Sequence, residues 1–218
     1  MSTSVLILGE SGSGKSSSLR NLKASETLLI QAVRKPLPFR SAEWKEFDKA
    51  TAPAGNIWVF DQSHDIVNAM TRTKRKIIVL DDFQYVLANE YMRRSDQTGF
   101  QKFSDIGRHA WDILTAASAL APDVRVYILA HTDTDDTGRI KAKTIGKLLD
   151  EKICVEGMFS VVLRTSVING QYLLSTHNNG QDTVKTPMGM FEDDHIDNDL
   201  AAIDAAIVDY YGLVPQTA

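Results

Sequence analysis

The residues best suited to chemistry lie within "VLILGESGSGKSSSL". Its core, Gly9-x-x-x-x-Gly14-Lys15-Ser16, fills every fixed position of the phosphate-loop pattern G-x-x-x-x-G-K-[ST] and follows an apolar, strand-like run. The glycines let backbone N–H groups converge on an anion, with help from the start of a helix that we expect to follow. Lys15 is expected to reach the β- and γ-phosphates, and the Ser16 hydroxyl to bind Mg²⁺. The predicted nucleotide-binding residues are Gly9, Glu10, Ser11, Gly12, Ser13, Gly14, Lys15, Ser16 and Ser17.

A second motif, "KIIVLDDF", is an apolar strand that ends in two acids. A nucleotide hydrolase of this kind needs a carboxylate at the end of a neighbouring strand to hold Mg²⁺, and Asp81 fits that role. Asp82 stands where the residue that activates the attacking water is expected. It is shorter than the more common Glu, which favours slow turnover.

A third element, His131, follows the strand-like run "RVYILA". A polar side chain at that point can contact the γ-phosphate and respond to its loss. A structural or simply exposed histidine is equally compatible with the sequence.

The motifs favour ATP over GTP. Guanine-specific enzymes carry N-K-x-D after a late strand, whereas the corresponding segment here reads "HTDTD" and lacks the lysine. A small-molecule kinase would need an arginine-bearing lid, and neither "RTKRKI" nor "YMRRSD" is convincingly placed in one. We therefore expect ATP and Mg²⁺ as cofactors, with a kinase as the weakest alternative.

The hydrophobic pattern predicts an α/β fold with three layers and a mostly parallel central sheet, because the central strands are continuous, β-branched and not alternating. A helical pattern runs from Phe103 to Leu120 and is closed by Pro122. Asn169-Gly170 predicts a hairpin at an antiparallel edge. Segments 93–99, 131–139 and 177–189 are predicted to be loops. The predicted strands are Val5–Leu8, Leu28–Gln31, Ile57–Phe60, Ile77–Asp81, Arg125–Ala130, Val161–Arg164 and Tyr172–Ser175.

Charge divides the chain of 218 residues at about residue 175. From Thr176 onward there are eight acids and one lysine, whereas residues 1–175 are mildly basic. We predict a core domain, 1–175, and an acidic segment, 176–218, whose helix is capped by Asp197 or Asn198 and ends at Gly212. The chain has no apolar run of about 18 residues, so no membrane span is expected. The single cysteine fits a reducing cytoplasm.

The motif order resembles the RecA-like ATPase core. The amino-acid sequence of the motifs is closer still to the phage RecA-like ATP-binding proteins of the single-strand-annealing (Sak-type) group. The segments that carry this resemblance are "GESGSGKSSSLRNL", "IQAVRKPLPFRS", "IIVLDDFQYV", "ILAHTD", "TIGKLLDEK" and "TPMGMFEDDHIDNDL". The resemblance implies a Mg²⁺-dependent ATPase that binds single-stranded DNA, forms a ring or filament, and promotes annealing or recombination of phage DNA in the bacterial cytoplasm. Whether a single-strand-binding protein is a partner stays open.

The resemblance also implies a cation supplied to the γ-phosphate by a neighbouring subunit. Lys141-x-Lys143 looks like such a pair, because residues at i and i+2 of an extended segment point to the same side. For single-stranded DNA, Arg93, Arg94, Phe100 and Lys102 combine the cations and aromatic ring that phosphate contact and base stacking need. Both sets could equally be ordinary solvated surfaces.

The chain departs from full-length recombinases because "IQAVRKPLPF" lacks the acid that often follows their second strand. The identity of the catalytic base is therefore open. The main alternative is a nucleotide-dependent assembly or switch ATPase that does not bind DNA and acts through the acidic segment.

Overall fold

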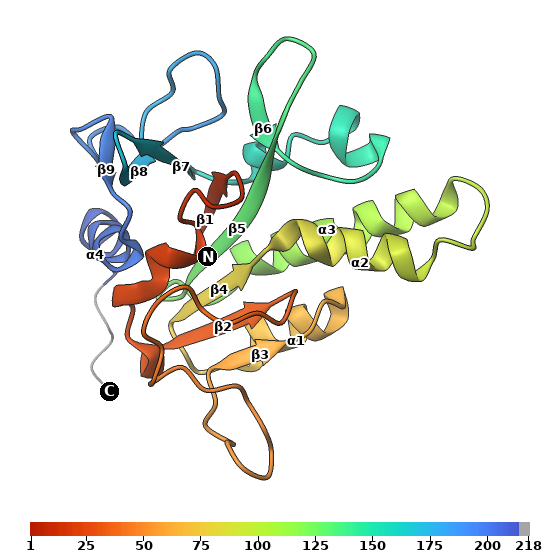
Figure 1. The fold of residues 1–218 in the computed structure, drawn as a ribbon, viewed down its shortest axis with the longest axis horizontal. Coiled ribbons are helices and arrows are strands. Elements are labelled where there is room, and N and C mark those ends of the chain that lie inside the picture. The colour runs from red at the N-terminus through yellow and green to blue at the C-terminus, as the bar shows by residue number, and fades with distance from the viewer. Residues whose placement is uncertain (214–218) are drawn as a thin grey trace.

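The computed structural model describes residues 1–213, apart from the side chain of residue 150. Over this range the strands form one mixed sheet in the order β3-β2-β4-β5-β1-β7-β8-β9, with β6 paired to the end of β5 (Figure 1). Residues 214–218 of the predicted acidic segment lie outside the described residues. The strands are β1 (Thr3–Gly9), β2 (Thr27–Gln31), β3 (Ile57–Val59), β4 (Ile77–Asp81), β5 (Arg125–Thr134), β6 (Ile140–Ala142), β7 (Val161–Ile168), β8 (Gln171–Ser175) and β9 (His195–Asp197).

The helices lie on both sides of the sheet, as the apolar, non-alternating strands predict. Helices α1, α2 and α3 cover one face, and α4 lies on the other (Figure 1). The bounds are α1 (Ser63–Arg72), α2 (Phe83–Arg93), α3 (Gln101–Ser118) and α4 (Leu200–Tyr210), with short 3₁₀ turns at Ser16–Asn21 (η1), Ala24–Glu26 and Val155–Met158 and a π-helical turn at Leu148–Lys152. The three-layer α/β architecture is confirmed.

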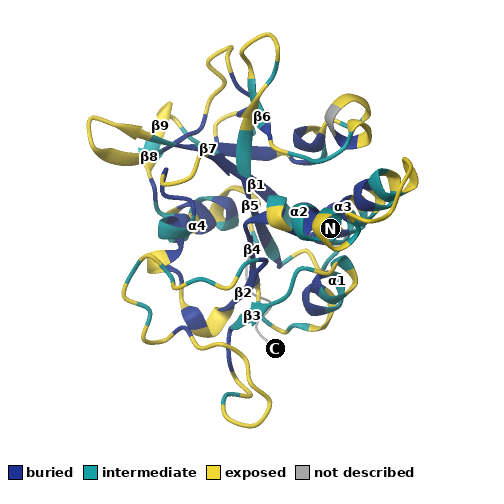
Figure 2. Ribbon diagram, turned by 45° about the vertical axis from the view of Figure 1, so that its right-hand side comes forward, coloured by how far each residue is buried: buried dark blue, intermediate teal, exposed yellow. Residues whose placement is uncertain are grey.

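The core follows the period of two that a strand imposes on its side chains. In β1, Leu6 and Leu8 pack under α1–α3, while Val5 and Ile7 face η1 and α4. All four are fully buried, and the dark blue strands at the centre of Figure 2 show the same burial across the sheet. This two-sided burial explains why the strand sequences lack polar alternation.

The strand order brings three predicted site residues to one edge of the sheet. Strands β1, β5 and β4 are parallel neighbours, so their carboxyl ends lie side by side. Gly9 is in register with His131, and Asp81 ends β4 on the other side of β5. Ligand sites in open α/β sheets lie outside these carboxyl ends.

The hairpin is confirmed, and its turn is of the expected kind. Asn169 and Gly170 both have positive φ, 52° and 79°, as a two-residue turn between right-twisted strands requires. β8 is not the last strand, however. β9 pairs antiparallel with β8 and forms the edge of the sheet.

Two local predictions are wrong. The first, that His131 follows its strand and that residues 131–134 are loop, is wrong because β5 continues to Thr134, where it pairs with β6. The helix expected after the phosphate loop is present as the short 3₁₀ helix η1.

The second wrong prediction concerns the N-cap of α4. Asp199 caps this helix through a hydrogen bond from the Ala201 amide, because Asp197 belongs to β9 and Asn198 turns toward the phosphate loop. The predicted stop at Gly212 is confirmed. Its amide bonds the Asp209 carbonyl, and its positive φ is the usual helix-ending conformation. The boundary after residue 175 stays a prediction.

Candidate functional site

The phosphate loop connects β1 to η1 in a conformation that its glycines make accessible. Gly12 and Gly14 have φ of +80° and +100°, a region that side chains with a Cβ rarely adopt. A Cβ on Gly14 would also lie 2.5 Å from Nδ2 of Asn198, and one on Gly9 would lie 1.9 Å from Oγ1 of Thr165. Close packing therefore requires glycine at positions 9 and 14, and backbone shape favours it at positions 12 and 14.

Side chains from other elements hold the loop in place. The Ser13 hydroxyl lies 2.7 Å from the Glu10 carbonyl and 2.6 Å from Oγ1 of Thr165 on β7. On the other side, Asn198 Nδ2 donates to the Gly14 carbonyl at 2.8 Å. The sequence gives no signal for Asn198, which reaches the loop through the pairing of β9 with β8.

Lys15 folds back over the loop that carries it. Its Nζ donates to the carbonyls of Gly9 and Glu10 at 2.7 and 2.8 Å, and the residue is buried. Burial lowers the pKa of Lys15 to about 8, against the opposing effect of the nearby carboxylates of Asp82 and Asp81. Two neutral carbonyls thus satisfy an ammonium that a phosphate would attract more strongly.

Ser16 and Asp81 meet as the sequence predicts for a magnesium site. Ser16 Oγ donates to Asp81 Oδ2 at 2.9 Å and lies 3.2 Å from Oδ1. Asp81 is fully buried, and this burial, together with the charge of Asp82, raises its pKa. A hydroxyl and a carboxylate side by side are oxygen ligands of the kind that Mg²⁺ prefers.

Asp82 occupies a left-handed conformation between β4 and α2, with φ 61° and ψ 46°. Its two carboxylate oxygens contact different side chains: Oδ2 accepts from Lys35 Nζ, and Oδ1 lies 3.4 Å from Nε2 of His131. Burial alone would raise the pKa of Asp82, but hydrogen bonds from His131 and Lys35 outweigh it and lower the pKa. The predicted water-activating residue is therefore already paired on both sides.

Lys35 is a charged residue at this site that was not predicted from the sequence. It lies in the connection between β2 and β3, where Gln31 Nε2 donates to its carbonyl at 3.2 Å. Its Nζ lies 3.8 Å from Oδ2 of Asp81 in addition to its contact with Asp82. The sequence does carry a signal for Lys35. A lysine follows the second strand closely, in the segment where full-length recombinases often have an acid.

His131 lies at the edge of the same site. It is the register partner of Gly9 across the β1–β5 pair, and its ring meets that of Tyr85 edge-on at 6.0 Å. Together with its contact to Asp82, this places an imidazole between the two carboxyl ends that carry the phosphate loop and the acids. The sensor role stays a prediction.

Lys15, Ser16, Lys35, Asp82 and His131 line one cavity of about 370 Å³, whereas the buried Asp81 is not among its lining residues. Its floor is the phosphate loop, and its walls come from the connection after β2, from α2, from β5 and from the β7–β8 hairpin. The half-exposed ring of Tyr172 belongs to this hairpin and was not predicted as part of the site. The lining residues are Ser11, Gly12, Gly14, Lys15, Ser16, Ser17, Val33, Lys35, Pro36, Pro38, Asp82, Tyr85, His131 and Tyr172.

The predicted lysine pair lies outside this cavity. Lys141 is in β6 opposite Asp133, and Lys143 is exposed just beyond the strand, where its amide donates to the His131 carbonyl at 2.8 Å. Both therefore flank the His131 side of the site without lining it. A role for them on a neighbouring subunit stays a prediction.

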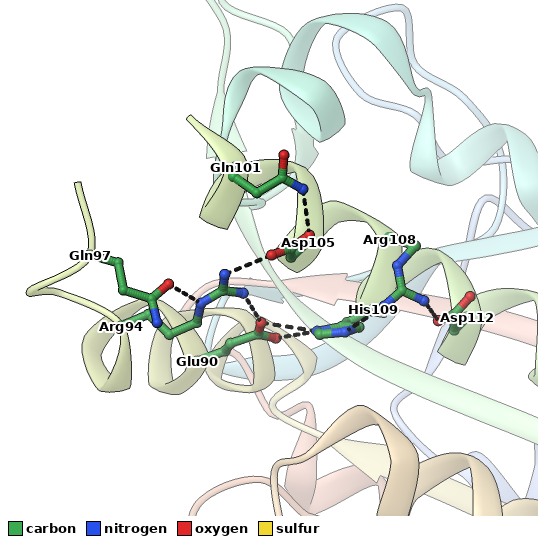
Figure 3. A network of polar contacts seen from close by, with 8 residues as sticks. All are labelled: Glu90, Arg94, Gln97, Gln101, Asp105, Arg108, His109 and Asp112. Carbon is green, nitrogen blue, oxygen red and sulfur yellow. Dashed lines mark hydrogen bonds and ion pairs between the residues drawn. The ribbon is translucent and has the colours of Figure 1, made fainter. Parts of the chain in front are cut away.

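The predicted DNA-binding residues lie at the tip of the α2–α3 hairpin. Arg94 bonds Glu90 at 3.0 Å and Asp105 at 2.6 Å, so its guanidinium joins the two helices (Figure 3). Arg93 pairs with Asp61 at 2.7 Å. Phosphate contacts by either arginine would have to compete with these ion pairs.

The other two members of this set differ from the arginines. The ammonium of Lys102 lies over the rings of Tyr91 and Phe103, at 5.1 and 5.6 Å from their centroids. Phe100 is 87% exposed, which leaves its ring free to meet another molecule. The structure therefore brings the four residues to one tip, but DNA binding there stays a prediction.

Within residues 1–213, leaving aside the side chain of residue 150, no group of three or more His, Cys, Asp or Glu side chains could hold a metal ion. Ser16 and Asp81 would still fit Mg²⁺, which takes few protein ligands and completes its shell with water and phosphate oxygens. In the same range no helix has the length and apolarity to cross a membrane.

No family model matches the chain, and no curated protein matches it.

Proposed function

We propose that the chain is a Mg²⁺-dependent, RecA-like ATPase that binds single-stranded DNA and promotes annealing or recombination of phage DNA in the bacterial cytoplasm. The observation that carries the nucleotide part is the hydrogen bond between Ser16 and Asp81 beside the buried Lys15, in a cavity floored by the phosphate loop. Residues from two separate sequence motifs thus meet with the chemistry that a metal–triphosphate complex needs.

Each residue has a defined task in this proposal. The loop amides and Lys15 neutralise phosphate oxygens once Lys15 releases the carbonyls of Gly9 and Glu10. Ser16 and Asp81 hold Mg²⁺, which would supply positive charge to the phosphates. Asp82 is the candidate to orient water, but both of its carboxylate oxygens are engaged by Lys35 and His131. Turnover is therefore expected to be slow until one of these contacts opens.

The RecA-like part is supported by the strand order and by the resemblance. β5 lies between β1 and β4, so His131 stands between the phosphate loop and Asp81. This is where a residue that senses the γ-phosphate has to be. Binding of single-stranded DNA and growth into a ring or filament rest on the resemblance and on the mildly basic residues 1–175.

One observation favours the alternative, a nucleotide-dependent assembly or switch ATPase that does not bind DNA. The ion pairs of Arg93 with Asp61 and of Arg94 with Glu90 and Asp105 engage two of the four residues proposed for DNA. In this case the exposed Phe100 at the same tip would meet a protein.

The deciding experiment measures nucleotide and DNA binding on one preparation. Calorimetry with Mg²⁺ and ATP should show one saturable site. ATP turnover should rise with single-stranded DNA, and DNA affinity should fall with salt, because phosphate contacts release counterions. Particle size with ATP and an oligonucleotide should increase. Nucleotide binding without DNA binding at low salt would favour the alternative, and absence of nucleotide binding would remove both.

A further inference from the structure

The connection between β2 and β3 places a second lysine in the nucleotide cavity. Lys35 Nζ contacts Asp82 and lies 3.8 Å from Asp81, and both carboxylates are almost completely buried. It lines the same cavity as Lys15 and Ser16. We propose that Lys35 is a further phosphate-binding residue, which supplies from the same chain the cation for the terminal phosphate of a bound nucleoside triphosphate. This inference rests on the proposed function.

The charges in the cavity support this role. Two ammonium groups and two carboxylates balance one another there, and Asp81 and Lys15 already have tasks at the metal and the phosphates. Without Lys35, the carboxylate of Asp82 would keep only its contact with His131, and its negative charge would repel an incoming polyphosphate. With Lys35, the site can accept the anion.

Lys35 also has the freedom to change partners. Its side chain is 37% exposed, whereas those of Asp81 and Asp82 are only 1% and 6% exposed. A lysine ammonium carries three donors on a flexible stem, so it can keep Asp82 and add a phosphate oxygen. Its carbonyl accepts a hydrogen bond from Gln31 and Pro36 follows it, so the backbone at the start of the stem is restricted.

The position of Lys35 predicts discrimination between nucleotides. Asp81 and Ser16 would hold Mg²⁺, which would supply positive charge to the terminal phosphates of a bound triphosphate. A cation beside both aspartates therefore serves the terminal phosphate more than the others. Lys35 should strengthen binding of ATP and leave binding of ADP nearly unchanged. A cation from the same chain would also let a single subunit bind ATP without Lys141 or Lys143 from a neighbour.

The test compares ATP and ADP affinity by calorimetry with Mg²⁺. We expect Lys35→Met to weaken ATP binding about tenfold and ADP binding less than about twofold, and Lys35→Arg to retain most of the ATP affinity. Lys49→Met is the matched control, because Lys49 is an exposed lysine of the same connection that does not line the cavity. Circular dichroism and a thermal melt check that each variant folds.

A second background separates phosphate binding from mere pairing with Asp82. In Asp82→Asn, adding Lys35→Met should still cost about tenfold in ATP affinity, because the lost contact is to phosphate. If the effect of Lys35→Met disappears in that background, or if ATP and ADP weaken equally, the inference is overturned. The Asp82→Asn background also serves if Lys35→Met alone fails to fold, since it removes the charge that would be left unpaired.

The two proposals fail in different ways. Wild-type protein that binds neither nucleotide contradicts the proposed function and this inference together. Wild-type protein that binds both, with Lys35→Met unchanged in its preference for ATP over ADP, contradicts the inference alone.

Discussion

Ser16 donates a hydrogen bond of 2.9 Å to Asp81, across 65 positions of the sequence. The first residue ends the phosphate loop, and the second ends a strand that lies two places away in the sheet. Since the intervening strand β5 places His131 beside them, three separate segments contribute to one site.

Asp81→Asn should separate metal binding from folding. The pKa of Asp81 is raised by burial and by the charge of Asp82, so the folded state disfavours its ionised form. Removing the charge should leave the melting temperature unchanged or higher at pH 7 while Mg²⁺-dependent ATP affinity falls about tenfold or more. Calorimetry with and without Mg²⁺ measures the effect. Unchanged dependence on Mg²⁺ would show that the metal lies elsewhere.

Lys15→Ala should abolish ATP binding in a chain that stays folded. The ammonium is buried against two carbonyl oxygens, and the lowered pKa of Lys15 shows that burial opposes its charge. The melting temperature should therefore change by only a few degrees, about what 1 kcal/mol produces in a protein of this size. Lys49→Ala is a suitable control. ATP turnover retained by Lys15→Ala would contradict the assignment of the phosphate loop.

The strands and the phosphate loop could be predicted because their signals are local. Val5–Leu8 is a continuous apolar run, and Gly9 to Ser16 is one motif, so neither requires knowledge of distant contacts. β6 and β9 have only three residues each and were missed. Their formation depends on pairing with β5 and β8, which no local pattern reveals.

Residues brought in by packing could not be predicted in the same way. Asn198 reaches Gly14 through the β8–β9 pairing, and Lys35 reaches the two acids through the connection after β2. Arg94 has the positive charge that a contact with DNA phosphate needs, but its guanidinium is paired with Asp105 of the next helix. Sequence composition gives the chemistry of a side chain, whereas its partners follow from the fold.

Gly14→Ala should damage the loop more than Gly12→Ala. Both positions have positive φ, but a Cβ at Gly14 would meet Asn198 at 2.5 Å and Tyr172 at 2.9 Å, whereas open space surrounds Gly12. Gly12→Ala is expected to cost about 1–2 kcal/mol from backbone strain alone. Gly14→Ala should cost more and remove ATP binding. Urea unfolding and calorimetry on the pair test this, and equal effects would argue against close packing at Gly14.

Asp105→Asn should reduce the acid sensitivity of the α2–α3 hairpin. The pKa of Asp105 lies below the ordinary 3.8, mainly because Arg94 and then Gln101 donate hydrogen bonds to the carboxylate. A lowered pKa in the folded state contributes stability that is full above about pH 4 and is lost as pH falls through the folded value.

Urea midpoints at pH 6 and pH 3 provide the measurement. The wild-type midpoint should drop on acidification by more than that of Asp105→Asn. Asp112→Asn, which removes an exposed carboxylate of the same helix, is the control. If the two variants lose the same stability on acidification, the Arg94–Asp105 pair does not stabilise the hairpin.

Asp204→Ala should be the most destabilising of these substitutions, because it leaves a buried arginine without its partner. Asp204 on α4 accepts two hydrogen bonds from Arg125, at 2.8 and 2.7 Å, and a third from the Tyr127 hydroxyl at 2.6 Å. Breaking one side of a buried pair costs about 3–5 kcal/mol, and Tyr127→Phe should cost only about 1 kcal/mol. Asp209→Ala, at an exposed position of α4, is the control. Thermal melts should show the largest loss of stability for Asp204→Ala, a smaller loss for Tyr127→Phe and the smallest for Asp209→Ala. Equal losses for the substitutions at 204 and 209 would mean that this carboxylate does not hold α4 to β5.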